Sequence, residues 1–295
     1  LEASTASNFT GTRYSSATTN IGLSTLTVAG LSVNTTYFWR VGSLNWNSAT
    51  NYAVLGATAT LAEFPQAGSP LFSGVFATSV TVQWTAGSPA NPSGTRYRLQ
   101  ASSTAFAAGT VIVTSTTANL FGTTASLLPN TTYSFRVSAL NWNNVPSLTV
   151  LGSTSTLANQ VQLAASTFLG VFETSATATW EAMPSSPPDA SSKTAEGYLL
   201  QASSTNFGAA LPGGLVYSSA TASQAASVLT VSGLDRNTTY YWRVGSLNWN
   251  SAPNYRTLGS TGTLASPVSG PQAYAMFETS ATVNWVALPA TPQPS

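Results

Sequence analysis

The chain has 295 residues, of which 43% are hydrophobic and only 6% are charged, and its formal net charge is +1. It contains no cysteine and no histidine, which excludes disulfides, zinc–thiolate sites, thiol nucleophiles and histidine-based triads. The absence of a basic stripe argues against nucleic-acid binding. No apolar run reaches the ~18 residues of a membrane helix, so we expect no membrane insertion in this segment.

Two segments recur along the chain. Residues 34–47 read "NTTYFWRVGSLNWN", and close copies occupy residues 130–143 and 237–250. A second segment, "FATSVTVQW", ends at Trp84 and returns as "FETSATATW" at Trp180 and "FETSATVNW" at Trp285. The copies recur about every 100 residues, which is the size of a whole small domain rather than of a solenoid repeat.

Taken in chain order, the repeats divide the sequence into four parts. We expect residues 1–62 to be a partial domain with the third to seventh strands, 63–158 and 159–265 to be complete domains, and 266–295 to supply the first two strands of another. Within a copy, "YSFRVSA" at 133–139 alternates apolar and polar residues, which indicates a half-buried strand. No stretch has a convincing helical period, so the pattern predicts an all-β fold of many short strands.

Together these landmarks resemble the fibronectin type III domain. That family has a tryptophan at the end of its second strand, as at Trp84, Trp180 and Trp285, and a leucine six residues before the tyrosine that starts strand F. The resemblance implies tandem seven-stranded, immunoglobulin-like sandwiches arranged as a rod, with these tryptophans in the cores. It also implies tyrosine corners, in which the hydroxyl bonds to backbone upstream, at Tyr37, Tyr133 and Tyr240. Asn34, Asn130 and Asn237 stand where the family has a turn glycine, and asparagine tolerates the left-handed conformation.

The end of the first repeated segment, "LNWN", places Trp46, Trp142 and Trp249 in the loop between strands F and G. One interpretation is an exposed aromatic platform for a sugar or a protein partner. The other is a ring that contacts the linker or the domain before it. The family's topology puts this loop at the pole where the chain enters, so we favour a contact between successive domains.

Little in the sequence points to catalysis. The carboxylates are scattered and form no pair that repeats in all copies, and neither a phosphate-binding loop nor an EF-hand pattern is present. We therefore predict no enzyme activity, no catalytic residue, no cofactor and no metal site. Asn8, Asn34, Asn130 and Asn237 begin N-x-Thr sequons and are candidate glycosylation sites.

These features favour a structural repeat segment of an extracellular or cell-surface, filament-forming protein, most consistent with a bacterial source. Its partners would be neighbouring repeats or copies of itself. Two alternatives stay open: an adhesin module that binds carbohydrate or protein through loop aromatics, and accessory domains of a secreted polysaccharide-degrading enzyme.

The two partial domains raise a further pair of alternatives. Either neighbouring repeats continue outside this segment, or residues 266–295 of one molecule complete residues 1–62 of the next by strand addition, head to tail. Both place Phe277, Val283 and Trp285 against Tyr37 and Trp39 of a partial domain.

Overall fold

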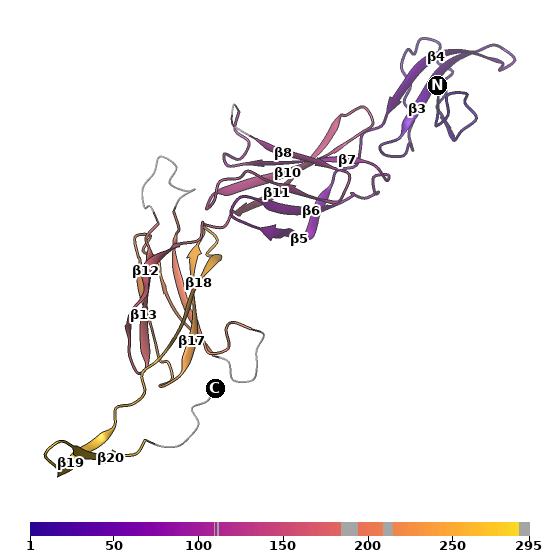
Figure 1. The fold of residues 1–295 in the computed structure, drawn as a ribbon. Helices are drawn as coiled ribbons and strands as arrows, with labels where there is room; N and C mark the ends of the chain where they lie inside the picture. The colour runs from indigo at the N-terminus through magenta and orange to yellow at the C-terminus, as the bar shows by residue number, and fades with distance from the viewer. Residues whose placement is uncertain (109, 111, 184–193, 209–214, 289–295) are drawn as a thin grey trace. The chain divides into compact units, whose positions relative to one another are not determined.

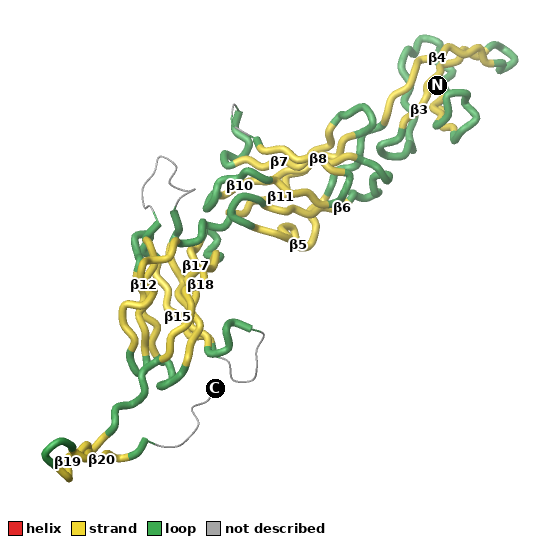
Figure 2. Tube along the Cα trace, in the orientation of Figure 1, coloured by secondary structure: helices red, strands yellow, loops and turns green. Residues whose placement is uncertain are grey.

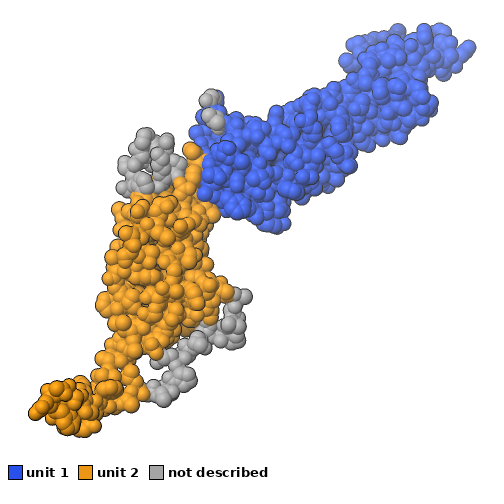
Figure 3. Space-filling model, viewed as in Figure 1, with its two compact units in different colours: residues 1–127, 132–154 blue, residues 128–131, 155–295 orange. Residues whose placement is uncertain are grey.

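The computed structural model describes residues 1–108, 110, 112–183, 194–208 and 215–288. Every regular element in these residues is a β-strand, which confirms the all-β prediction (Figures 1 and 2). The chain forms two compact units, residues 1–127 with 132–154, and residues 128–131 with 155–295 (Figure 3). Among the described residues there is no helix of a length and apolarity that could cross a membrane.

The first strands of the chain form a single four-stranded antiparallel sheet, which we call the N-terminal sheet. Its strands lie in the order β2-β1-β3-β4. They are β1 (Glu2–Ser4), β2 (Arg13–Ser15), β3 (Thr36–Leu44) and β4 (Thr50–Ala59). β1 falls within "LEAST", the degenerate copy of the "LQASST" segments at 99–104 and 200–205.

The next copy of the repeat forms a sandwich of two sheets, which we call the second sandwich because the N-terminal sheet belongs to the first copy. Its seven described strands lie in the orders β5-β6-β9 and β11-β10-β7-β8. The strands are β5 (Gln66–Val75), β6 (Val80–Thr85), β7 (Arg96–Ser102), β8 (Val113–Thr117), β9 (Phe121–Thr124), β10 (Thr132–Leu140) and β11 (Pro146–Ser155). Alternation along β10 places Phe135 and Val137 in the core. Trp84, at the end of β6, is buried and lies 5.8 Å from the ring of Tyr97.

The third sandwich repeats this arrangement, with sheets β12-β13-β16 and β15-β14-β17-β18. Its strands are β12 (Gln162–Val171), β13 (Ser175–Glu181), β14 (Gly197–Ser203), β15 (Val216–Thr221), β16 (Val228–Ser232), β17 (Thr239–Leu247) and β18 (Pro253–Gly262). Trp180 is buried against Tyr198, with ring centroids 5.2 Å apart. Within the residues that the structure describes, the prediction of seven-stranded sandwiches is confirmed for both complete copies.

The last described strands, β19 (Ser269–Met276) and β20 (Ala281–Val286), form a two-stranded antiparallel ribbon, which we call the C-terminal ribbon. Trp285 is 57% exposed there, in the segment expected to be two strands of a partial domain, so its place in a core stays a prediction. The reason is that its equivalents, Trp84 and Trp180, are buried by a facing four-stranded sheet, and no described sheet faces the ribbon.

The N-terminal sheet also differs from the expected five strands. Residues 25–28 align with β9 and β16 but form no strand. β9 and β16 each pair with one neighbour only, β6 and β13 respectively. No described strand pairs with residues 25–28 in this way, so their backbone lacks the hydrogen-bonding partner that makes the other two copies strands.

Candidate functional site: a repeated asparagine clamp

The turn before strand F has the same backbone conformation in all three copies. Asn34, Asn130 and Asn237 have φ values of +41°, +46° and +49°, the left-handed region that asparagine adopts more readily than most residues. Three residues later the tyrosine hydroxyl bonds back to the turn. The Tyr37 hydroxyl accepts a hydrogen bond from the Ser32 N–H at 3.0 Å.

Tyr240 makes the equivalent contact. Its hydroxyl accepts from the Asp235 N–H at 2.9 Å, and Tyr133 is likewise buried in the second sandwich. The turn and the corner together hold the repeated "NTT" at one end of each sheet.

In the first compact unit, the "LNWN" loop after β10 binds the end of β4. The Asn141 side chain donates from Nδ2 to the carbonyls of Ala59 and Thr60, at 3.4 and 3.1 Å. Two residues on, Asn143 Oδ1 accepts from the Ala59 N–H at 2.9 Å. Asn141 is buried, and its own Oδ1 accepts from two amides inside the loop. The side chain thus satisfies backbone groups on both segments at once.

Asn34 completes the contact from the other side. Its Oδ1 accepts from the Trp142 N–H at 3.0 Å, and its Nδ2 donates to Thr95 Oγ1 at 2.8 Å. Asn34 is fully buried. The two halves of the repeated segment therefore serve one contact: the "NTT" turn of one copy receives the "LNWN" loop of the next. We call this arrangement the asparagine clamp.

The second compact unit contains a second clamp. Asn248 Nδ2 donates to the carbonyls of Ser155 and Thr156, both at 3.0 Å, and Asn250 Oδ1 accepts from the Ser155 N–H at 3.1 Å. Asn130 Nδ2 donates to Thr194 Oγ1 at 3.3 Å and to Glu196 Oε1 at 2.9 Å. The loop asparagines thus bind equivalent backbone groups in both units, which makes this half of the clamp a property of the repeat. The bond from the turn asparagine to the loop is not repeated, because the buried Asn130 Oδ1 has no hydrogen-bond partner among the described residues.

The remaining copies of the two motifs are exposed. Asn45 and Asn47, in the loop after β3, lie at the surface, and so does Asn237. Asn45 Oδ1 still accepts from the amides of Asn47 and Ala49, at 3.0 and 2.9 Å. The loop therefore keeps its local conformation without a partner, while burial of its asparagines depends on the neighbouring segment.

The loop tryptophans contribute less to this contact than the sequence suggested. Trp142 and Trp249 are 51% and 59% exposed, and Trp46 is fully exposed. Trp142 contacts Asn34 through its backbone N–H, whereas its ring lies over Gly94, where an added Cβ would be 3.6 Å away. Sequence reasoning missed the flanking asparagines, although their retention in all three "LNWN" copies was the available signal.

A second repeated cluster was also missed. In each copy an arginine on the outer face of strand F donates from Nε to a side chain on the adjacent strand, at 2.8–2.9 Å. The pairs are Arg40 with Glu2, Arg136 with Gln100 and Arg243 with Gln201. Each guanidinium lies over a phenylalanine ring, with centroid distances of 3.9–4.2 Å for Phe9, Phe106 and Phe207. Such cation–π contacts stabilise the hairpin that carries the ring.

The structure also corrects two candidate glycosylation sites. Asn34 and Asn130 are buried, and the Nδ2 atom that would carry the sugar donates a hydrogen bond in each case. In the folded chain, Asn8 and Asn237 are the sequon asparagines at the surface. The described residues contain no group of three side chains that could hold a metal ion.

Two tyrosines of the third sandwich have perturbed acidity. Burial raises the pKa of the Tyr240 hydroxyl to about 12, and the neighbouring Asp235 carboxylate adds to the rise. Burial also raises the pKa of Tyr198. Both side chains favour the neutral hydroxyl in the folded state.

We expect the third sandwich to lose stability as the pH rises from 10 to about 12. Tyr240 ionises near pH 10 when unfolded and at about 12 when folded, so in this window the unfolded state has lost a proton that the folded state keeps. The free energy of unfolding therefore falls with rising pH, and the contribution is fully present below pH 10. Calorimetry across the pH range measures the effect.

Tyr240→Phe tests the assignment. At neutral pH it should cost about 1–3 kcal/mol, because the Asp235 N–H loses its acceptor. It should also reduce the fall in the free energy of unfolding above pH 10, leaving the part of that fall that Tyr198 causes. Tyr274→Phe, at an exposed position of β19, is the matched control and should change neither. A Tyr240→Phe chain with unaltered alkaline behaviour would contradict the assignment.

No protein-family model and no curated protein matches the chain. Solved structures do resemble it. A segment of two fibronectin type III domains from chicken tenascin has 16% sequence identity and a TM-score of 0.34, and the match covers 65% of this chain and 96% of that chain. The FN1–FN3 domains of chicken CNTN1 have 14% identity and a TM-score of 0.37, with 80% of each chain covered.

Proposed function

We propose that the chain is a non-catalytic structural repeat segment of an extracellular or cell-surface, filament-forming protein, consistent with a bacterial source. The asparagine clamp carries this proposal. In each clamp, two buried asparagines and several hydrogen bonds to backbone hold one segment against the next. A clamp is present in both compact units. A ligand site would need only one copy, whereas a spacer needs the same contact at every step.

The physical effect of the clamp is to restrict movement where a linker would otherwise be free. A short connection between two domains leaves their relative arrangement free unless contacts hold its ends. Asn141 and Asn143 bind the last residues of β4, immediately before the connection into the second sandwich. Each satisfied buried hydrogen bond contributes about 0.5–1.5 kcal/mol, and several acting together favour one arrangement strongly.

We expect Asn141→Ala to loosen the first compact unit. Because the chain has no cysteine, spin labels can be placed at Ala57→Cys on β4 and Thr116→Cys on β8, both exposed. Pulsed electron paramagnetic resonance should give a narrow distance distribution for the parent and a broader one for Asn141→Ala.

Asn45→Ala, the same change in the exposed copy of the loop, is the matched control and should leave the distribution narrow. If Asn141→Ala and the parent have the same distribution, the clamp does not set the geometry, and the proposed structural role loses its support.

The second candidate function is binding through the loop aromatics. It is favoured by the half-exposed rings of Trp142 and Trp249 and the fully exposed ring of Trp46. Glycan-array binding that disappears in the Trp46→Ala/Trp142→Ala/Trp249→Ala variant, while the spin-label distances stay narrow, would support an adhesin module instead.

A further inference from the structure

We propose that the outer face of the four-stranded sheet in the second sandwich binds an acidic polysaccharide through the carboxylates of its sugar units. Three arginines lie on this face, Arg96 and Arg98 on β7 and Arg136 on β10, and we call it the arginine face. The proposal goes beyond the structural role, because these arginines lie outside the asparagine clamp.

The three arginines share one side of the two central strands of the sheet. Tyr97 points into the core, so Arg96 and Arg98, the residues on either side of it in β7, point away from the core. The register of β7 and β10 pairs Arg98 with Ser138, which places Arg136 on the neighbouring diagonal. Same-face neighbours are about 7 Å apart along a strand and about 7–8 Å apart on a diagonal. Three positive charges therefore crowd onto one small area.

The second sandwich has no carboxylate placed to neutralise this charge. Residues 63–158 contain one acidic residue, Glu63, whose side chain lies against Gly87 in the loop after β6. Neither ion pair in the described part of the chain includes an arginine of this face. Like charges at neighbouring positions of a sheet destabilise it. In a chain with only 6% charged residues, such a cluster indicates an anionic ligand.

The arginine side chains are positioned by the sheet but keep unused donors. Arg136 donates from Nε to Gln100 Oε1 at 2.9 Å, and its guanidinium lies 4.0 Å from the centroid of the Phe106 ring. Within the described residues, Arg98 Nε and the hydroxyl of the fully buried Ser138 have no hydrogen-bond partner. The same residues offer no acceptor to the Nη atoms of the arginine face. These donors are therefore left for an acceptor from outside the chain.

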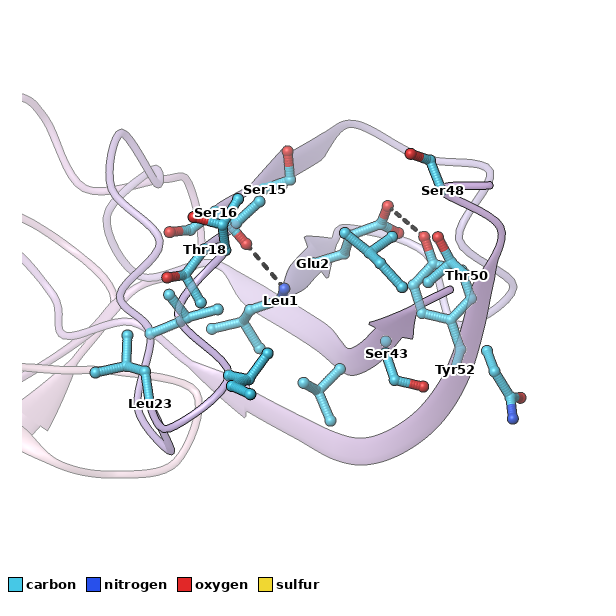
Figure 4. A pocket seen from close by; sticks show the side chains of 18 of the residues that line it. Leu1, Glu2, Ser15, Ser16, Thr18, Leu23, Ser43, Ser48, Thr50 and Tyr52 are labelled. Atoms are coloured by element: carbon cyan, nitrogen blue, oxygen red, sulfur yellow. Dashed lines mark hydrogen bonds between the residues drawn. The ribbon is translucent and has the colours of Figure 1, made fainter. Parts of the chain in front are cut away.

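The first copy of the repeat shows which anion this arrangement takes. There Arg40, the equivalent of Arg136, donates from Nε to Glu2 Oε2 at 2.8 Å, and its Nη2 lies 2.6 Å from the same oxygen. The Tyr52 hydroxyl donates to the other carboxylate oxygen at 2.8 Å (Figure 4). In the second sandwich Gln100 replaces Glu2, so the arginine has an amide beside it in place of a carboxylate. Because paired guanidinium donors match the two oxygens of a carboxylate, the expected ligand group is a carboxylate.

The surroundings of the arginines favour a sugar polymer over a protein. Exposed hydroxyls lie beside them on β8, at Thr114 and Thr116, and can form hydrogen bonds with sugar hydroxyls. The exposed apolar side chains Leu148 and Val150 lie on the edge strand β11. The centre of the face therefore lacks the apolar anchor of a typical protein interface. A polymer with a carboxylate on each unit can bind several arginines at once.

The third sandwich provides a comparison within the same chain. It keeps the arginine of strand F, but Gly197 and Leu199 occupy the positions of Arg96 and Arg98. We therefore expect the polymer to bind the second sandwich and not the third. Because the same fold accommodates leucine at this position, Arg98→Leu removes one charge of the face without disturbing the sheet.

The test is isothermal titration calorimetry of the 295-residue chain with an oligogalacturonate at low ionic strength. The parent should bind, and added salt should weaken the binding, because exposed charges make the contact. Arg98→Leu and Arg136→Gln should each weaken binding about tenfold or more. Arg256→Gln removes an exposed charge from the third sandwich and is the matched control. It should change the affinity by less than about twofold.

Two further ligands identify the source of the carboxylate. The methyl ester of the same oligomer keeps the sugar but has no charge, and it should not bind. A glutamate peptide of equal charge should bind more weakly than the oligogalacturonate, because it lacks the sugar hydroxyls. The unfolding temperature of each variant should stay near that of the parent, which shows that a loss of binding is not a loss of fold.

Four results would overturn the inference: a parent that does not bind the oligogalacturonate, equal binding of its methyl ester, tighter binding of the glutamate peptide, or an Arg256→Gln variant as weak as Arg98→Leu. Asn141→Ala should bind like the parent, because the clamp does not contribute to this face. The structural function is judged from the spin-label distances alone, so the two proposals fail separately.

Discussion

Replacing Trp180 with alanine is expected to lower the free energy of unfolding of the third sandwich by about 3–5 kcal/mol. The side chain is buried between the two sheets, it lies against the Tyr198 ring, and its indole N–H donates to the Ala226 carbonyl at 3.1 Å. The substitution removes the apolar contacts, leaves a cavity and deprives a carbonyl of its donor. A loss of this size approaches the whole stability of a small domain.

Calorimetry of the intact chain can measure the change, because the transition of the third sandwich should shift while that of the second moves little. Trp249→Ala is the matched control, since this ring is more than half exposed in a loop of the same sandwich. We expect the control to cost less than about 1 kcal/mol. A Trp180→Ala chain that unfolds like the control would mean that the ring does not fill the core.

The strands and cores could be predicted because their signal is local. Alternation along residues 133–139 fixes which side chains point inward, and three copies at one spacing indicate independent units. Trp84 and Trp180 are core residues for the same reason, since each ends an alternating run. Trp285 ends an identical pattern yet is exposed, because burial also requires a facing sheet, which a single strand pair cannot supply.

The asparagine clamp could be predicted only in part. The sequence marked the loop and the turn as repeated, and the topology brought them to one end of the fold. It did not indicate which atoms meet, because a tryptophan suggests contact area and an asparagine between polar neighbours suggests an ordinary loop. Asn141 and Asn248 are buried only through hydrogen bonds to backbone some 80 to 95 residues earlier in the chain, and no local pattern encodes such pairs.

Strand formation at residues 25–28 was overpredicted for a related reason. Their alternation matches that of β16, and Val28 is buried like Val231. Alternation reports which side chains face the core, but a strand also needs a hydrogen-bonded neighbour.

Asn248→Ala is expected to destabilise the second compact unit by about 2–4 kcal/mol. Asn248 is buried and makes four hydrogen bonds: Nδ2 donates to the Ser155 and Thr156 carbonyls, and Oδ1 accepts from the Asn250 and Ala252 amides at 3.0 and 2.8 Å. Alanine can replace none of them, so buried carbonyls and amides lose their partners together. Denaturant unfolding should measure the lower free energy of unfolding. Hydrogen exchange should show that the lost protection lies in residues 155–158 and 248–252.

Asn45→Ala separates the two halves of this effect. Asn45 Oδ1 accepts hydrogen bonds from two amides of its own loop, as Asn248 Oδ1 does, but Asn45 is exposed. Its substitution therefore measures the contribution of the hydrogen bonds within the loop alone. We expect it to cost under about 1 kcal/mol, because water can replace the lost acceptor. The difference between the two variants then gives the stabilisation that comes from binding the preceding segment. Equal costs at Asn45 and Asn248 would mean that the asparagine shapes its own loop and holds nothing else in place.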